Sequence, residues 1–277
     1  MTTDTAGQRP TLESDYPLKE EQIQDFRENG HVYLPGVASK DEVEYYRRAI
    51  NDAAEKHGQV IDIPMEERNT YNKAFLQHTN LWPHNEEVRA FVLSRRFGKI
   101  AAELLGVDGV RIYHDQALFK EPGGGHTPWH QDQFYWPIDT DNTVTMWMPL
   151  VDITEDMGML TFASRSHIDG YLGDMPISDE SDAEFNRFIK EKGMSIQRQK
   201  TMNAGDATWH YGWNLHSAPG NDSDKMREVM TVIYIADGCR VTEPRNENQK
   251  SDLESWMPGL KPGDLVASDL NPCPYKA

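Results

Sequence analysis

Cysteine is scarce in this sequence. Cys239 and Cys273 are the two cysteines among 277 residues, and neither belongs to a Cys-x-x-Cys pair. A framework of disulfide bonds is therefore not expected, and a reducing compartment, the cytoplasm, is the predicted location.

Long apolar runs are also missing. No hydrophobic stretch approaches the roughly 18 residues that a membrane-spanning helix needs. Residues 1–15 lack the apolar segment of a secretion signal and are instead rich in Thr, Asp, Gly, Pro and Ser. We therefore expect no signal peptide and no membrane span, and we predict a disordered tail over residues 1–15.

Positive charge is in deficit. The sequence has 28 lysines and arginines against 45 aspartates and glutamates, for a net charge of −17. So acidic a chain is not expected to bind nucleic acid or an anionic membrane. The expected partner is a small molecule, and the expected state is a monomer or a homodimer.

Two motifs of well-defined chemistry are absent. The glycine run at residues 123–125 is followed neither by Gly-Lys-Ser/Thr nor by a helical pattern, so it does not predict a phosphate-binding loop. The sequence also has no His-Glu-x-x-His, the helical motif of many zinc hydrolases. A zinc hydrolase is therefore disfavoured.

The hydrophobic period changes near residue 110. Helical spacing predicts helices over residues 18–29, 39–56 and 86–105, the second opened by a capping box of Ser39 and Glu42. From Val110 onward the period becomes two, which is typical of strands. Strands are predicted near residues 110–118, 128–134, 143–151, 158–163, 195–202, 206–211, 213–217 and 228–236.

Helices followed by about eight strands predict an all-β core with flanking helices, in the α+β class. The order favours a double-stranded β-helix, the jelly-roll or cupin-like fold, as a single domain over residues 16–277. An acidic stretch with a short helical segment, residues 170–194, interrupts the β pattern. It is predicted to be a lid, and an exposed acidic loop is the alternative.

A candidate metal site begins with His130 and Asp132. Residues two apart on a strand point to the same face, so the imidazole and the carboxylate would converge on one point. A second His-x-Asp, His167 with Asp169, lies in a turn-like sequence without the apolar and aromatic context of the first. We therefore expect the ligands at 130 and 132.

A third ligand must come from farther along the chain. His216 would complete a 2-His-1-carboxylate triad, the set that suits Fe(II) with open positions, and His210 is the rival. Arg227 lies eleven residues after His216, across a turn-rich insert that predicts a hairpin. Its planar fork could grip the far carboxylate of an iron-bound 2-oxo acid.

The sequence resembles the phytanoyl-CoA dioxygenase (PhyH) family of Fe(II)/2-oxoglutarate-dependent oxygenases. The resemblance covers roughly residues 20–240, and its ordered set of motifs is more specific than any one motif. The matching stretches are residues 113–125, 129–132, 147–150, 157–160, 166–167, 204–206 and 216–221, followed by Arg227.

This resemblance implies the same fold and a cofactor set of Fe(II), 2-oxoglutarate and O₂. It favours His216 over His210 as the third ligand, and it implies that Arg227 binds 2-oxoglutarate. Gln116 and Trp147 match positions near the cosubstrate, and a core residue is the alternative interpretation for Trp147. Many members have a small hydroxyl residue two after the distal histidine, where this chain has Ala218, and Ala163–His167 replaces the usual Pro-Gly-Ser-His.

The implied reaction is hydroxylation, or another oxidation, of an unactivated C–H bond, with release of succinate and CO₂. The aromatic run at residues 134–136 suggests a small, partly apolar substrate. A fatty acyl-CoA is less expected, because no basic patch for its phosphates is evident. Asp132 argues against a halogenase, which replaces this carboxylate by Gly or Ala. The alternative from another class is a cupin-like binding protein that has lost catalysis.

Overall fold

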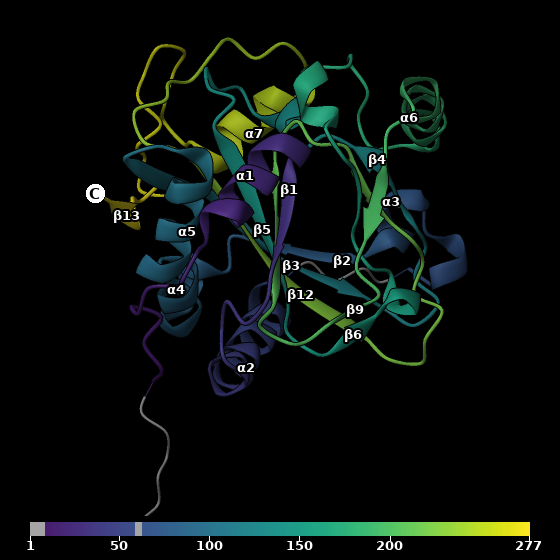
Figure 1. The fold of residues 1–277 in the computed structure, drawn as a ribbon, viewed down its shortest axis with the longest axis horizontal. Coiled ribbons are helices and arrows are strands. Elements are labelled where there is room, and N and C mark those ends of the chain that lie inside the picture. The colour runs from purple at the N-terminus through teal and green to yellow at the C-terminus, as the bar shows by residue number, and fades with distance from the viewer. Residues whose placement is uncertain (1–8, 59–62) are drawn as a thin grey trace, which may run out of the picture.

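The computed structural model describes residues 9–58 and 63–277. Its centre is a pair of antiparallel sheets that face each other, which confirms the predicted double-stranded β-helix (Figure 1). The larger sheet has the order β1-β10-β5-β12-β3-β13, with β2 also paired to β3, and the smaller has the order β4-β11-β7-β8. A separate short pair, β6 and β9, lies near one end.

The strand bounds are as follows. The larger sheet contains β1 (His31–Leu34), β2 (Leu76–Thr79), β3 (Gly109–Lys120), β5 (Thr143–Pro149), β10 (Ala207–Tyr211), β12 (Arg227–Ala236) and β13 (Tyr275–Lys276). The smaller contains β4 (Thr127–His130), β7 (Thr161–Ala163), β8 (Ile196–Arg198) and β11 (His216–Ala218), and the short pair is β6 (Ile153–Thr154) with β9 (Thr201–Met202).

The helices gather mainly on the outer face of the larger sheet, on the left of Figure 1. They are α1 (Glu20–Asn29), α2 (Lys40–His57), α4 (Glu86–Val92) and α5 (Arg95–Leu105), whereas α3 (Thr70–Ala74), α6 (Asp179–Lys192) and α7 (Glu247–Trp256) lie elsewhere. Five 3₁₀ turns complete the described elements: η1 (Met65–Glu67), η2 (Trp82–His84), η3 (Asp132–Tyr135), η4 (Glu155–Met157) and η5 (Ser166–Asp169).

The main core lies between these helices and the larger sheet. Phe26, Ile50 and Phe97 from the helices pack with Trp209 and Val232 from the sheet, and all five are fully buried. Burying such large apolar side chains contributes roughly 1.5–3 kcal/mol each. The opposite face of the larger sheet is thereby held rigid, and it forms one wall of the space between the sheets.

Several local predictions are confirmed. Helix α1 ends at Gly30, whose φ of 83° is left-handed, and Ser39 and Glu42 form the predicted capping box of α2. The predicted helix over residues 86–105 is wrong in one respect, because it is two helices. Ser94 is extended and its side chain accepts a hydrogen bond from the Phe97 amide, so it ends α4 and starts α5.

The predicted strands differ from the observed ones mainly at their ends, but the one strand predicted over residues 195–202 is wrong, because it is two strands, β8 and β9, which belong to different sheets. The strand predicted over 128–134 stops at His130 and continues as η3, and the strand predicted over 213–217 starts at His216. Helix α7 was not predicted at all, since the tail shows no clear apolar period. In the predicted lid region, helix α6 lies against β4, with the Asp182 carboxylate accepting a hydrogen bond of 2.9 Å from the Trp129 amide.

The predicted disordered tail needs correction over residues 9–15, and residues 1–8 lie outside the described part. Leu12 is 2% exposed and belongs to the main core. Its carbonyl accepts a hydrogen bond of 3.0 Å from the Arg96 amide, and the Arg96 guanidinium donates to the Ser14 carbonyl at 2.9 Å. One apolar anchor and backbone hydrogen bonds hold a segment whose composition alone predicted disorder.

No helix in the described residues is long and apolar enough to cross a membrane.

The packed tail predicts a measurable stability effect. Leu12→Ala should lower the free energy of unfolding by about 2–5 kcal/mol, the usual cost of emptying a core site. Denaturant unfolding of this variant beside Thr11→Ala, at an exposed neighbouring position, provides the comparison. Equal stability of the two variants would mean that residues 9–15 do not pack against the core.

Candidate active site

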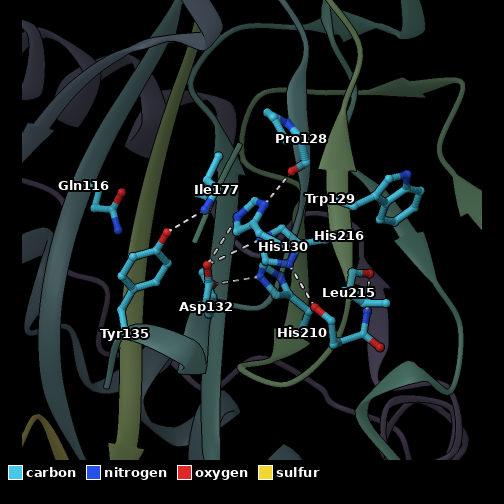
Figure 2. Close-up of polar contacts among 12 residues, drawn as sticks. Gln116, Pro128, Trp129, His130, Asp132, Tyr135, Ile177, His210, Leu215 and His216 are labelled. Atoms are coloured by element: carbon cyan, nitrogen blue, oxygen red, sulfur yellow. Dashed lines mark hydrogen bonds and ion pairs between the residues drawn. The ribbon is translucent and has the colours of Figure 1, made fainter. Parts of the chain in front are cut away.

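The three predicted metal ligands, His130, Asp132 and His216, meet between the two sheets. Strands β4 and β11 are antiparallel neighbours, and their register places His216 directly opposite His130. Asp132 opens η3 immediately after β4, so the 3₁₀ turn, not the strand, presents its carboxylate. One ligand atom from each of the three residues lies within 4.8 Å of the other two (Figure 2).

The hydrogen bonds of His130 and His216 leave the Nε2 atom of each ring free to bind a metal. The Nε2 atoms of His130 and His216 lie 3.6 and 3.5 Å from Asp132 Oδ1. The Nδ1 atoms lie 2.8 Å from the Pro128 carbonyl and 2.9 Å from the Asn214 carbonyl. Because a carbonyl can only accept, each Nδ1 carries the proton and each Nε2 keeps a lone pair for a metal.

Asp132 is oriented by groups on the larger sheet. Its Oδ2 accepts a hydrogen bond of 2.9 Å from the Thr145 hydroxyl and lies 3.3 Å from His210 Nε2. Oδ1 is left for the two opposing histidines. His210, the rival third ligand, is therefore a neighbour of the carboxylate, and it is not part of the cluster that His130, Asp132 and His216 form.

The pKa values of the site residues are shifted by burial and by one another. Burial would raise the pKa of Asp132, but the surrounding His216, His130 and His210 together lower it well below its usual value. Burial lowers the pKa of His210 to about 4, and burial followed by the proximity of His216 lowers that of His130. His130 and His210 are therefore neutral near pH 7. Burial would lower the pKa of His216 as well, but the neighbouring Asp132 raises it above its usual value, so a metal ion that binds there would displace the proton.

The donor set suits one class of metal ion. Two imidazole nitrogens and one carboxylate oxygen on one side of a cavity form the facial triad of non-heme Fe(II), which leaves positions open to other ligands. The second nitrogen of each imidazole is already fixed by a backbone carbonyl, as metal-binding histidines require. The residues present therefore fit Fe(II).

The triad opens into a cavity of about 590 Å³. Arg227 lines it and is 2% exposed, with its guanidinium 5.4 Å from the Trp147 ring centre. One guanidinium nitrogen donates to the Gly158 carbonyl at 2.6 Å, and within the described residues Arg227 Nε has no hydrogen-bond partner. Burial lowers the pKa of Arg227 to about 9, so an anion that reached it would be bound strongly.

A second buried basic side chain lies beside Arg227. Lys120 is its register partner on β3, and Lys120 Nζ donates to the carbonyls of Gly125 and, at 3.1 Å, Pro219. Burial, and then the charge of Arg227, lower the pKa of Lys120 to about 6. Where the family often has a hydroxyl, Ala218 pairs across the sheet with Thr127, and both line the cavity.

Gln116 also lines the cavity, within a chain of hydrogen bonds. Tyr71 donates to the Gln77 side-chain carbonyl at 2.5 Å, and the Gln77 amide donates to Gln116 Oε1 at 2.7 Å. The polar side chain that needed a partner on an apolar strand thus has one in Gln77. The structure brings Gln116, Trp147 and Arg227 to one cavity with the triad.

The second His-x-Asp pair lies apart from this cavity. His167 stacks on Tyr211, and its Nε2 lies 3.2 Å from the Arg27 carbonyl. Asp169 forms an ion pair with Lys192 at 2.6 Å. His167 and Asp169 therefore make structural contacts in a turn, as the sequence around them predicted.

Sequence reasoning missed one wall of the cavity, the helix α7. Asn248, Ser251, Asp252, Ser255 and Trp256 all line it. Their spacing of three and four residues marks one helical face, and Asn246 accepts a capping hydrogen bond from the Gln249 amide. This spacing and the Asn246 cap could have indicated the helix. Helices were predicted from the period of apolar residues, however, and a polar face does not contribute to that period.

Comparison with known proteins identifies relatives of this chain. The model of the phytanoyl-CoA dioxygenase (PhyH) family matches residues 26–229. Phytanoyl-CoA dioxygenase domain-containing protein 1 of Danio rerio is 27% identical over 146 residues, which are 51% of this chain and 50% of the relative. The chain spans about half the length of the curated relatives it matches.

Solved structures share the fold. The non-heme alpha ketoglutarate dependent carbocyclase SnoK from nogalamycin biosynthesis has a TM-score of 0.77 at 24% identity, covering 96% of this chain and 99% of its own. The epimerase SnoN, in complex with Fe3+, alpha ketoglutarate and nogalamycin RO, has a TM-score of 0.75 at 24% identity, covering 92% and 98%. At such identities the likeness establishes the fold.

The triad predicts a graded loss of metal binding. His130→Ala, Asp132→Ala and His216→Ala should each lose most Fe(II) binding in anaerobic titration calorimetry. His210→Ala should weaken it by about 10–100-fold, the usual effect of removing a group that orients a ligand. His167→Ala is the matched control and should bind like the native chain. Native affinity in any of the first three variants would remove that residue from the triad.

Proposed function

The chain belongs to the phytanoyl-CoA dioxygenase family, and on this premise we propose that it is an Fe(II)- and 2-oxoglutarate-dependent oxygenase. It oxidises an unactivated C–H bond of a small, partly apolar molecule. In the simplest case R–H, O₂ and 2-oxoglutarate become R–OH, succinate and CO₂. One oxygen atom enters the product and the other enters succinate, so the reaction needs no further reductant.

One observation carries this proposal. A facial triad with two lone-pair nitrogens and a buried arginine line the same cavity. Burial of the guanidinium costs free energy unless an anion pairs with it, so an anionic ligand is expected in the cavity beside the metal site. A dicarboxylate anchored at the triad and at Arg227 explains both features.

The side chains then have separate tasks. Bound Fe(II) would supply the activation of O₂. Arg227 pairs with the distal carboxylate of 2-oxoglutarate. The Trp147 ring, over which the Arg227 guanidinium lies, flanks the cosubstrate. Thr127 faces the cavity opposite Ala218 and supplies the hydroxyl that position 218 lacks. The free amide group of Gln116 is available as a donor nearby.

The substrate fills the rest of the cavity, between the triad and α7. Phe75, Tyr135, Trp136 and Trp256 give this part an apolar lining, which supports a partly apolar substrate. Arg227 is the one lysine or arginine among the described lining residues, and 2-oxoglutarate uses it. A substrate that carries phosphates, such as an acyl-CoA, therefore has no cationic partner there.

We also propose that residues 170–178 close the cavity as a lid, with α6 as its fixed support. Pro176 and Ile177 line the cavity, and the Ile177 amide donates to the Tyr135 hydroxyl at 3.0 Å (Figure 2). Helix α6 is tied to β4 by hydrogen bonds from the Trp129 amide and indole to Asp182 and Asn186. Closure would exclude water from the reaction.

The competing interpretation is an inactive cupin-like binding protein. Fe(II)-dependent conversion of 2-oxoglutarate to succinate separates the two, because a binding protein would form none. Intact Asp132 also disfavours a halogenase.

Arg227 offers the direct test of cosubstrate binding. Arg227→Ala should raise the 2-oxoglutarate concentration for half-maximal succinate formation strongly, since truncating one member of a buried charged pair costs about 2–5 kcal/mol. Arg227→Lys should recover only part of the loss, because an ammonium lacks the planar fork. An unchanged 2-oxoglutarate requirement in the alanine variant would refute this role.

The lid proposal predicts a local change in hydrogen exchange. Tyr135→Phe removes the hydroxyl that accepts from Ile177, so amides in residues 170–178 should exchange faster while those of α6 stay as they were. Succinate formation without substrate should rise, and Fe(II) affinity should not change. Identical exchange over residues 170–178 in the variant and the native chain would count against a lid held by this contact.

A further inference from the structure

Helix α7 forms a substrate-facing wall that lies outside the family match. The match ends at residue 229, whereas α7 spans Glu247–Trp256. In Figure 1 this yellow helix lies beyond one end of the sheets. Its polar face lines the cavity, and Leu253, together with Met257 just after the helix, packs into a small core. A wall that the family pattern does not cover is a natural place for substrate specificity.

Asp252 carries the one charge on the cavity-lining face of α7. Its Oδ2 accepts a hydrogen bond of 2.9 Å from the Tyr113 hydroxyl on β3, which holds the carboxylate in place. Burial raises the pKa of Asp252 to about 7, although hydrogen bonds from Tyr113 and Trp256 lower it. A carboxylate has room for about four hydrogen bonds, so capacity remains for a group in the cavity.

When Asp252 is ionised, the charges that line the cavity do not balance without a further cation. Histidines aside, the described lining residues that can carry charge near pH 7 are Asp132, Arg227 and Asp252, the last about half ionised at its pKa of about 7. The two charges of Fe(II) cancel those of 2-oxoglutarate, and Asp132 offsets Arg227. Asp252 is left over, and the imidazole on β3, that of His114, is kept neutral because burial lowers its pKa to about 4.

We propose that Asp252 binds a protonated amine of the substrate, so that the substrate class is a small cationic amine with an apolar body. This inference rests on the proposed function, which fills the other two charged positions. Trp256 and Tyr71 add aromatic rings to the same cavity, and such rings favour a cation. An anionic substrate would meet an unpaired carboxylate and is disfavoured.

A matched set of probes tests this without knowledge of the natural substrate. Phenylalkylamines with one to four methylenes are compared with the alcohols of the same lengths, by calorimetry on anaerobic protein loaded with Fe(II) and 2-oxoglutarate. The native chain should bind the best amine about tenfold or more tightly than its alcohol, as expected for a charge-assisted hydrogen bond. Asp252→Asn should reduce that preference to about twofold or less and leave alcohol binding unchanged.

Two controls keep the result interpretable. Asparagine still offers an oxygen to Tyr113, so α7 should stay anchored, and thermal unfolding checks this. Ser251→Ala, on the same face of α7, should keep the preference for the amine. The inference would be overturned if the native chain bound amine and alcohol equally, or bound no amine at millimolar concentration. It would also be overturned if the Asp252→Asn variant kept the preference for the amine.

The same samples separate this inference from the proposed function. The complex of Fe(II) with 2-oxoglutarate has a visible charge-transfer absorption. If this absorption forms and the amine preference is missing, only the role of Asp252 fails. If it does not form in the native chain, the proposed function fails and takes the inference with it.

Discussion

The pairing of β4 with β11 is the constraint on which the site depends. It places His216 across from His130, and the two imidazoles would be useless as ligands if the register slipped by one residue. The carboxylate between them is held from the opposite sheet by Thr145 and His210. The site therefore exists only when both sheets are assembled, and the helical core behind the larger sheet keeps that wall in place.

Burial and charge divide the cavity into regions with different tasks. Near Arg227 the cavity is cationic and suits a dicarboxylate, at the triad it suits a metal ion, and toward α7 it is aromatic and weakly acidic. Unpaired charge inside a protein costs free energy, so the charge of each region indicates the kind of group that it binds. The residues of the first two regions lie within the family match, whereas α7, which forms the third, lies beyond it.

Much of this could be predicted from the sequence because local patterns and ordered motifs carry it. The period of two after Val110, the His-x-Asp pair and the step to Arg227 led to the fold and to the residues that meet at the cavity. What failed was set by tertiary contacts. A single serine cap split the helix at Ser94, one buried leucine held residues 9–15, and α7 shows the cavity a polar face that apolar periodicity cannot detect.

In the proposed function, one cavity holds Fe(II) on the triad and 2-oxoglutarate between that metal and Arg227. Anomalous diffraction at the iron edge, from crystals grown anaerobically with both, tests it most directly. We expect one iron peak within bonding distance of His130 Nε2, Asp132 Oδ1 and His216 Nε2. We also expect the distal carboxylate of 2-oxoglutarate to pair with the Arg227 guanidinium. Iron bound by His210 in place of His216, or a dicarboxylate that leaves Arg227 unpaired, would contradict it.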